Sequence, residues 1–119
     1  MREYREAEQS MSVCAWRGAA ALLRSALDKV LVANGYDEKD LYNKIEAAGT
    51  DGLVTTARLK RADELVCTLR NDVLHDEWRE VDQKDAEAAH RYVGRIIEDL
   101  YDDRATVEAL LREKGRLPG

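Results

Sequence analysis

The stretch VCAWRGAAALLRSALDKVL, residues Val13–Leu31, decides the fold of this 119-residue chain. Its apolar residues recur at steps of three and four, which places them along one side of an α-helix. This apolar stripe comprises Val13, Trp16, Ala19, Ala20, Leu23, Ala26, Leu27, Val30 and Leu31. The helical pattern begins near residue 2, and Asn34-Gly35 is a typical stop, with Gly35 suited to a left-handed cap. The sequence therefore predicts a first helix over residues 2–34.

Three further helices are predicted, each opened by side chains that can cap its first turn. Their ranges are 37–48, with Asp37 and Asp40 as a capping box, 55–76, capped by Thr55 or Thr56, and 82 to about 111, with Asp82 and Asp85 as a box-like first turn. Asp102-Asp103-Arg104 is expected to bend or break the last one. Short loops favour antiparallel neighbours, and no strand pattern competes. The prediction is an all-α, antiparallel bundle of four main helices, in one domain over residues 1–119.

Charge and cysteine usage limit the classes of function. The formal net charge is -5, so no general basic coat is available for nucleic acid, and any such contact must come from a few Arg or Lys on one face. Cys14 and Cys67 lie within apolar helical patterns and are expected to be reduced and packed. The polar first residues and the lack of a long apolar run predict a cytoplasmic protein, with no signal peptide and no membrane span.

The stretch Arg70-Asn71-Asp72-Val73-Leu74-His75, late in the predicted helix over 55–76, carries the chemistry. At about 100° per residue, Asn71 and His75 lie about 40° apart and roughly opposite the apolar stripe of their helix. Arg70 points about 140° away from His75. One chain therefore cannot hold a single phosphate with both residues, unless the helix bends after Leu74 or a second copy supplies one of them.

These residue types suffice for RNA cleavage without a metal ion. A histidine that titrates near neutrality can take a proton from a ribose 2′-hydroxyl or give one to a leaving oxygen. An arginine fork stabilises the extra charge on phosphorus, and an asparagine orients the imidazole or a phosphate oxygen. We therefore predict His75 as the proton-transfer residue, Arg70 as the charge stabiliser and Asn71 as the orienting group. The alternatives are an ordinary exposed His75 near a helix C-terminus and an Arg70 that reaches water beside the stripe.

The pattern Arg70-Asn71-x-x-x-His75 at the end of a bundle helix resembles the signature of the HEPN superfamily, small all-α domains of prokaryotic defence and toxin–antitoxin systems. The order of the surrounding segments is similar to that in a restriction-enzyme-associated branch, domain of unknown function 4145. Those segments are Trp16–Arg24, Leu41–Ile45, Leu69–Asp76 and Asp85–Tyr101. The resemblance covers about residues 10–103.

The resemblance implies a homodimer in which motifs from both chains meet in one cleft, which would unite Arg70 with His75. It further implies RNA as the ligand and an antitoxin or a restriction subunit as partner. The chain departs from the branch at Arg70 and Cys67, where many members carry Gly and Arg. It also has Glu77 where some toxins carry a tyrosine that an antitoxin modifies, so that modification is not expected. Two functions stay open: a metal-independent endoribonuclease or RNA-binding domain, and a non-catalytic dimerisation or interaction module.

Four arginines outside the motif are predicted to form a modest basic patch. Arg91 and Arg95 share one face of the last helix and are predicted RNA contacts, and Arg58 and Arg61 share a face less strictly. Solvated helix faces are the alternative. His90, at the edge of a core stripe, is expected to be packed or half exposed. Two histidines without clustered cysteines predict no metal site, and without a Gly-rich phosphate loop no cofactor is expected.

Overall fold

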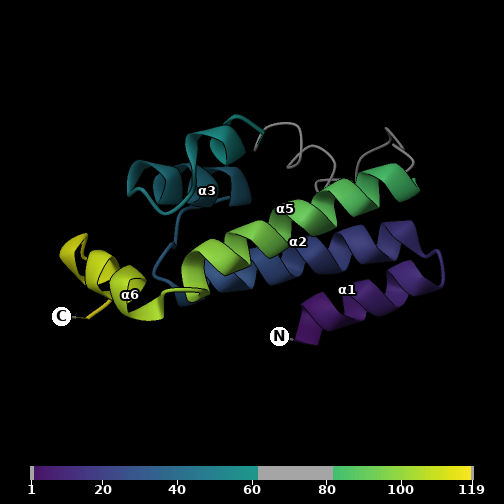
Figure 1. The fold of residues 1–119 in the computed structure, drawn as a ribbon, viewed down its shortest axis with the longest axis horizontal. Helices are drawn as coiled ribbons and strands as arrows, with labels where there is room; N and C mark the ends of the chain where they lie inside the picture. Colours follow the sequence, from purple (N-terminus) through teal and green to yellow (C-terminus); the bar gives the residue numbers. More distant parts are fainter. Residues whose placement is uncertain (1, 62–81, 119) are drawn as a thin grey trace.

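All regular structure in the described part of the chain is helical. The computed structural model describes residues 2–61 and 82–118, and no strand occurs among them (Figure 1). The helices are α1 (Arg2–Ser12), α2 (Trp16–Ala33), α3 (Leu41–Thr50), α5 (Gln83–Tyr101) and α6 (Arg104–Glu113), and residues 56–61 are helical as well. The predicted all-α class is confirmed. The predicted helix over 55–76 is described only as far as residue 61, so Arg70, Asn71, His75 and Cys67 lie outside the described residues.

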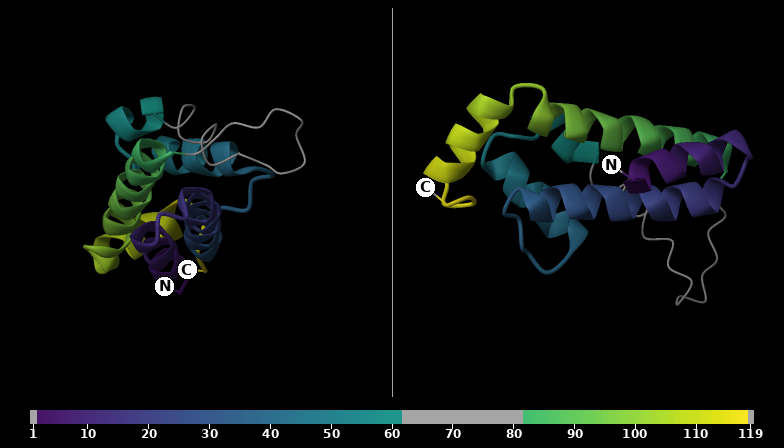
Figure 2. Two further views of the ribbon diagram at one scale, coloured as in Figure 1. Left: turned by 90° about the vertical axis from the view of Figure 1, so that its right-hand side faces the viewer. Right: turned by 90° about the horizontal axis from the view of Figure 1, so that it is seen from below.

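The first predicted helix is in fact two helices. The chain turns at residues 13–15, and α1 folds back antiparallel along α2 (Figures 1 and 2). The turn is a Schellman motif, in which the Ala15 amide donates to the Ser10 carbonyl at 2.8 Å and the Cys14 amide to the Met11 carbonyl at 3.0 Å.

The predicted single helix over residues 2–34 is therefore wrong. Cys14 adopts φ 59°, a left-handed conformation that glycine usually marks in a sequence. The predicted packing of Val13 and Cys14 is also wrong, because the turn leaves Val13 74% exposed and Cys14 exposed.

The central helix is α2, which packs against α1 and α5. Its buried residues are Ala19, Ala20, Leu23, Ala26, Leu27, Val30 and Leu31, so the predicted stripe is confirmed from Ala19 onward. All of these except Ala19 and Ala26 join one core cluster with Ala86, Ala89, Tyr92, Val93, Ile96 and Leu100 of α5. Burying each large apolar side chain contributes about 1.5–3 kcal/mol relative to leaving it exposed. Within residues 2–61 and 82–118, no helix combines the length and the apolar character needed to cross a bilayer.

The helices α2 and α5 run parallel, because both begin at the same end of the molecule (Figure 1). Their C-terminal ends meet, since Asn34 Nδ2 donates to Tyr101 Oη at 3.1 Å. At the start of α1, the Tyr4 ring stacks on the His90 ring with centroids 5.0 Å apart. The predicted antiparallel bundle of four main helices is thus not confirmed, because α2 and α5 run parallel and the antiparallel pair α1 and α2 was predicted as one helix.

Acidic caps set most of the helix starts. Asp82 and Asp85 form the predicted capping box at the start of α5, with the Asp85 amide 2.8 Å from Asp82 Oδ1. The predicted break at Asp102-Asp103 is confirmed, because Asp103 caps α6. The predicted start of the second helix at residue 37 is wrong: Asp40 caps α3 by accepting from the Asn43 amide at 2.8 Å.

Two polar networks fasten α6 and the residues after it to the end of α2. Asn34 is fully buried; its Nδ2 also donates to the Val30 carbonyl at 2.7 Å, and its Oδ1 accepts from Arg104 Nη1 at 2.6 Å. Beside it, the Arg116 guanidinium lies 4.5 Å from the centroid of the buried Tyr36 ring.

Arg116 is also ion-paired on two sides, with its Nη1 2.6 Å from Glu38 Oε1 and its Nε 3.2 Å from Asp51 Oδ2. Gly35 allows the Arg116 backbone to lie close to the end of α2. It has φ 90°, and a Cβ built there would lie 2.1 Å from the Arg116 carbonyl oxygen. The predicted left-handed cap at Gly35 is confirmed.

Candidate functional site

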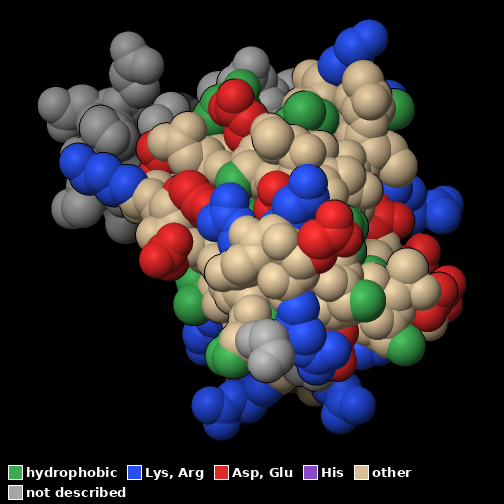
Figure 3. Space-filling model, turned by 90° about the vertical axis from the view of Figure 1, so that its left-hand side faces the viewer, with side chains coloured by type: hydrophobic (Ala, Val, Ile, Leu, Met, Phe, Trp, Pro, Cys, Tyr) green, Lys and Arg blue, Asp and Glu red, His purple; other side chains and the backbone are tan. Residues whose placement is uncertain are grey.

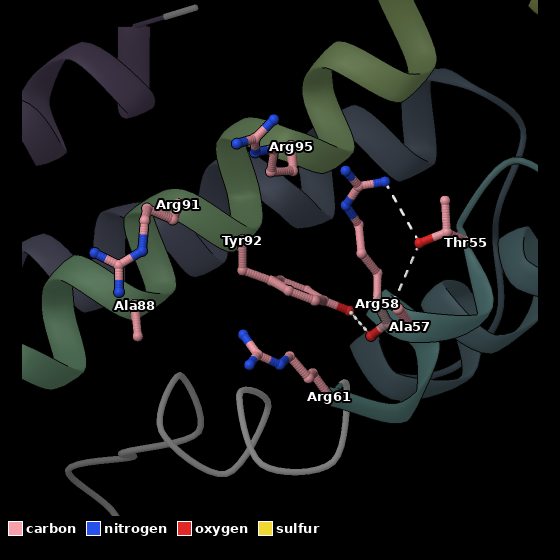
Figure 4. A pocket seen from close by; sticks show the side chains of 8 residues that line it. All are labelled: Thr55, Ala57, Arg58, Arg61, Ala88, Arg91, Tyr92 and Arg95. Atoms are coloured by element: carbon pink, nitrogen blue, oxygen red, sulfur yellow. Dashed lines mark hydrogen bonds between the residues drawn. The ribbon is translucent and has the colours of Figure 1, made fainter.

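Four arginines from two elements line one groove. The groove has a volume of about 560 Å³ and lies between residues 55–61 and α5 (Figure 4). We call it the arginine groove, and its described lining is Thr55, Ala57, Arg58, Arg61, Ala88, Arg91, Tyr92 and Arg95. The structure thus brings together the two arginine pairs that the sequence predicted to form a modest basic patch.

Helical spacing explains why the arginines of each wall face the groove. Thr55 begins the helical residues 56–61: its carbonyl accepts from the Leu59 amide at 2.9 Å and its Oγ1 from the Arg58 amide at 3.3 Å. Arg58 and Arg61 follow three residues apart on that turn. On α5, Arg91 and Arg95 are four apart and exposed, so they share a face.

Tyr92 joins the two walls. Its side chain comes from α5, is 5% exposed, and donates a hydrogen bond from Oη to the Arg58 backbone carbonyl at 3.1 Å. Burial raises the pKa of the Tyr92 hydroxyl to about 12, although the nearby Arg58 charge opposes that rise. The hydroxyl therefore keeps its proton at neutral pH and remains a donor.

The charges in the groove are compensated unequally. Arg58 Nη1 lies 2.6 Å from Asp99 Oδ2, and both side chains are about one quarter exposed, at 24% and 23%. Burial raises the pKa of the Asp99 carboxyl, and attraction to Arg58 opposes this rise. Within residues 2–61 and 82–118, no carboxylate pairs with Arg61 or Arg91.

Arg95 is only loosely paired. Its Nη1 lies 3.9 Å from Glu98 Oε2, and the two side chains are 65% and 69% exposed. An exposed ion pair of this kind contributes about 0–1 kcal/mol, because water and salt screen it. Three of the four groove arginines therefore present positive charge that nothing in the described lining neutralises strongly.

The groove suits an anion. Guanidinium groups bind phosphate oxygens through paired N–H donors, and several of them together fit a ligand with more than one phosphate. Elsewhere the charge is mixed: at the end of the molecule that carries α6, Figure 3 shows basic and acidic side chains interspersed. This excess of arginine is local, as the net charge of -5 requires.

The described lining of the groove contains no histidine, so it offers binding without an evident proton-transfer group. His90 lies elsewhere, stacked on Tyr4 with its Nε2 3.3 Å from Glu8 Oε2 and its side chain 28% exposed. The prediction of a packed or half-exposed His90 is confirmed. Among residues 2–61 and 82–118, no cluster of His, Cys, Asp or Glu could hold a metal ion.

The structure places the predicted site residues in two groups. Arg91 and Arg95, the predicted RNA contacts, both line the groove, whereas Arg70, Asn71 and His75 lie outside the described residues. Sequence reasoning missed Asp99 as the partner of Arg58. The two are 41 positions apart, and a single sequence holds no signal that pairs them.

The chain matches one family over nearly its whole length. The sequence profile of the family described as Domain of unknown function (DUF4145) matches residues 5–117. No curated protein and no solved structure matches the chain.

Proposed function

We propose that this chain, which belongs to the DUF4145 family, is an RNA-binding domain of the HEPN type that acts in a prokaryotic defence or toxin–antitoxin system and cleaves RNA without a metal ion. The observation that carries the proposal is the arginine groove. An otherwise acidic chain gathers four arginines there from two elements, and three of them lack a strong carboxylate partner in the described lining. Such a surface favours a phosphate-bearing ligand.

The chain links this groove to the residues proposed for cleavage. Arg61 ends the described helical residues 56–61, and Arg70 follows nine residues later in the sequence. We assign His75 to proton transfer, Arg70 to stabilising charge on phosphorus and Asn71 to orienting the imidazole or a phosphate oxygen. The role of the groove is to hold the strand.

The proposed reaction is transesterification within the RNA. The ribose 2′-oxygen forms a bond to the adjacent phosphorus and the bond from phosphorus to the 5′-oxygen breaks. The products carry a 2′,3′-cyclic phosphate and a 5′-hydroxyl. The 2′-hydroxyl loses one proton and the leaving 5′-oxygen gains one, so a histidine that moves protons balances the step. Arg70 stabilises the additional negative charge on phosphorus in the transition state.

We further propose a homodimer. On a straight helix Arg70 and His75 diverge by about 140°, so Arg70 of one copy and His75 of the other would complete one site. An antitoxin or a restriction subunit is the proposed partner of that dimer.

The direct test is cleavage of end-labelled RNA in EDTA by the purified protein. We expect wild-type cleavage with 2′,3′-cyclic phosphate ends, loss of activity in His75→Ala and Arg70→Ala, and weakened RNA binding in Arg91→Gln. Arg112→Gln, an exposed change on α6, is the matched control and should bind as wild type. Activity equal in wild type and His75→Ala would contradict the assignment of His75.

Mixing the two inactive variants tests the shared site. If each site takes Arg70 from one chain and His75 from the other, an equal mixture restores about a quarter of wild-type activity, since about half the dimers are mixed and each holds one intact site. If both residues come from the same chain, the mixture remains inactive. Sedimentation of the wild-type protein establishes the dimer independently.

The second candidate is a non-catalytic dimerisation or interaction module in a defence or restriction assembly. The observation that favours it is a described groove lining with arginines and no proton-transfer side chain. This candidate predicts RNA binding without cleavage, and a His75→Ala variant that loses stability or self-association.

A further inference from the structure

We infer that the four groove arginines divide their roles: Arg61, Arg91 and Arg95 hold the phosphates of a bound strand, while Asp99 withholds Arg58 from the ligand. Arg58 is then a positioning residue of the groove wall. This inference rests on the proposed function and adds which groups touch the ligand and what chemistry they recognise.

Arg58 is held from several directions. Its Nη1 lies 2.6 Å from Asp99 Oδ2 and 3.5 Å from Thr55 Oγ1, and its backbone carbonyl accepts from Tyr92 Oη at 3.1 Å. Its side chain is 24% exposed. To reach a phosphate, the Arg58 guanidinium would have to give up a short, charge-assisted hydrogen bond that water screens only in part. If a phosphate replaced the Asp99 carboxylate beside Arg58, the Arg58 charge would be compensated no better than before.

The other three arginines differ from Arg58 in both pairing and exposure. Arg61, Arg91 and Arg95 are exposed, and the one carboxylate within ion-pair distance of any of them in the described residues is Glu98, 3.9 Å from Arg95. Figure 4 shows the Arg58 head group turned toward Thr55, and those of Arg61 and Arg91 turned away from it. A phosphate that binds these three replaces water and counterions instead of a protein carboxylate.

The described lining favours phosphates over bases. Binding of bases without hydrogen-bond readout relies on exposed aromatic rings for stacking. The one aromatic side chain in the described lining is Tyr92, which is 5% exposed and has its hydroxyl engaged. Ala57 and Ala88 add no hydrogen-bonding side chain. The chemical class recognised is therefore the phosphodiester backbone, irrespective of base.

The salt dependence of binding measures how many phosphates each variant contacts. For a single strand, the logarithm of the association constant falls with the logarithm of salt concentration by about 0.7 per neutralised phosphate. Losing one contact therefore lowers the slope by about 0.7 and weakens binding about fivefold at 0.1 M salt, relative to 1 M.

The experiment measures fluorescence anisotropy of a 2′-O-methyl oligouridylate, which cannot be cleaved through its 2′-oxygen, over a range of NaCl concentrations. Arg61→Gln, Arg91→Gln and Arg95→Gln should each lower the slope by about 0.7. Arg58→Gln should keep the wild-type slope. Asp99→Asn, which releases Arg58, should steepen the slope by about 0.7 and tighten binding about fivefold at 0.1 M salt. An oligoadenylate should bind as tightly as the oligouridylate.

A double variant controls for misfolding caused by breaking the ion pair between Arg58 and Asp99. Arg58→Gln with Asp99→Asn replaces the ion pair by two amides that can still hydrogen-bond, and it should retain the wild-type slope, as should Arg112→Gln. Equal loss of slope in Arg58→Gln and Arg91→Gln, with normal wild-type binding, would overturn the inference alone. Wild-type protein that shows no salt-dependent binding would overturn the proposed function as well.

Discussion

Two pairs of arginines in this small protein have opposite surroundings. At the α6 end, Arg104 contacts buried Asn34 and pairs with Glu108 at 3.1 Å, and Arg116 pairs with both Glu38 and Asp51. Each also lies over a tyrosine ring, at 4.6 Å for Arg104 and 4.5 Å for Arg116. In the arginine groove, Arg61 and Arg91 have no carboxylate partner among the described residues.

This difference shows that the role of an arginine depends on whether a carboxylate lies close to it. A paired arginine is structural, and an unpaired one is available to bind a ligand. At the α6 end, Arg104 bonds the Asn34 side chain and Arg116 pairs with Glu38 and Asp51, so these two arginines hold different segments together. In the groove, positive charges sit close to each other and gain from an anion that arrives in solution. The α6 arginines should therefore affect stability far more than RNA binding, and the groove arginines the reverse.

The largest expected effect comes from Gly35→Ala, which disturbs the α6 end. The new Cβ would combine a left-handed backbone with overlap of the Arg116 carbonyl oxygen at 2.1 Å. We expect the free energy of unfolding to fall by about 4 kcal/mol, from strain at φ 90° and displacement of the Arg116 backbone. Urea unfolding followed by circular dichroism measures it. A loss below about 1 kcal/mol would mean that Arg116 moves away at little cost.

The reciprocal change, Cys14→Gly, is the control for the turn itself. Cys14 ends α1 with φ 59° in the same kind of motif. Glycine relieves its left-handed strain, so we expect a gain of about 1 kcal/mol. Cys14→Ser keeps the strain, removes the thiol and should leave stability unchanged.

The two turns also show how far the sequence predicts this fold. Asn34-Gly35 marks the end of α2 because glycine reveals the left-handed position, and the prediction there is confirmed. The same geometry at Cys14 has no glycine to reveal it, so the hairpin of α1 and α2 is not predictable from the local pattern. The parallel run of α2 and α5 is likewise a tertiary property, which loop lengths do not determine.

The candidate site, like the fold, is predictable from the sequence only in part. Helical spacing predicts that Arg91 and Arg95 share a face, and the structure confirms it. The meeting of that face with Arg58 and Arg61 depends on the packing of α5 and on the Tyr92 hydrogen bond, neither of which a single sequence records. The roles of Arg70, Asn71 and His75 remain predictions, because these residues lie outside the described part of the chain.

The next largest loss of stability is expected on removing the charge of Arg116. Arg116→Gln removes the partner of Glu38 and Asp51, whose side chains are only 24% and 12% exposed. We expect a loss of about 3 kcal/mol, mainly from leaving two partly buried carboxylates without a cation. RNA affinity should not change. Urea unfolding and the anisotropy titration together measure both quantities, and weakened RNA binding in a folded variant would contradict the division of roles.

The third prediction concerns how the buried tyrosine of each region affects stability at alkaline pH. An unfolded tyrosine titrates near 10, whereas burial raises the pKa of Tyr92 to about 12. Stability from the neutral hydroxyl is thus fully present below pH 10 and is lost as the pH rises through about 12. The two-unit shift corresponds to about 3 kcal/mol.

In Tyr92→Phe, the part of the stability loss at alkaline pH that comes from Tyr92 should disappear. The variant should also lower the unfolding free energy by about 1 kcal/mol at pH 7, because the hydrogen bond to Arg58 is lost. Tyr36→Phe is the matched variant at the α6 end, because burial and the hydrogen bond to Asp51 also raise the pKa of Tyr36. Unfolding free energies at pH 7 and pH 11 for both variants make the comparison. An unchanged alkaline loss in Tyr92→Phe would show that another group dominates.

The smallest change in stability is expected for Arg91→Gln. This variant distinguishes a ligand-binding arginine from a structural one. Arg91 is exposed and has no carboxylate partner in the described residues, so its removal breaks no ion pair there and relieves repulsion from neighbouring arginines. We expect unfolding free energy to stay within about 0.5 kcal/mol of wild type, with any change toward greater stability at low salt. The same variant should bind RNA more weakly. A stability loss as large as that of Arg116→Gln would place Arg91 among the structural arginines and remove the reason to regard the groove as a binding site.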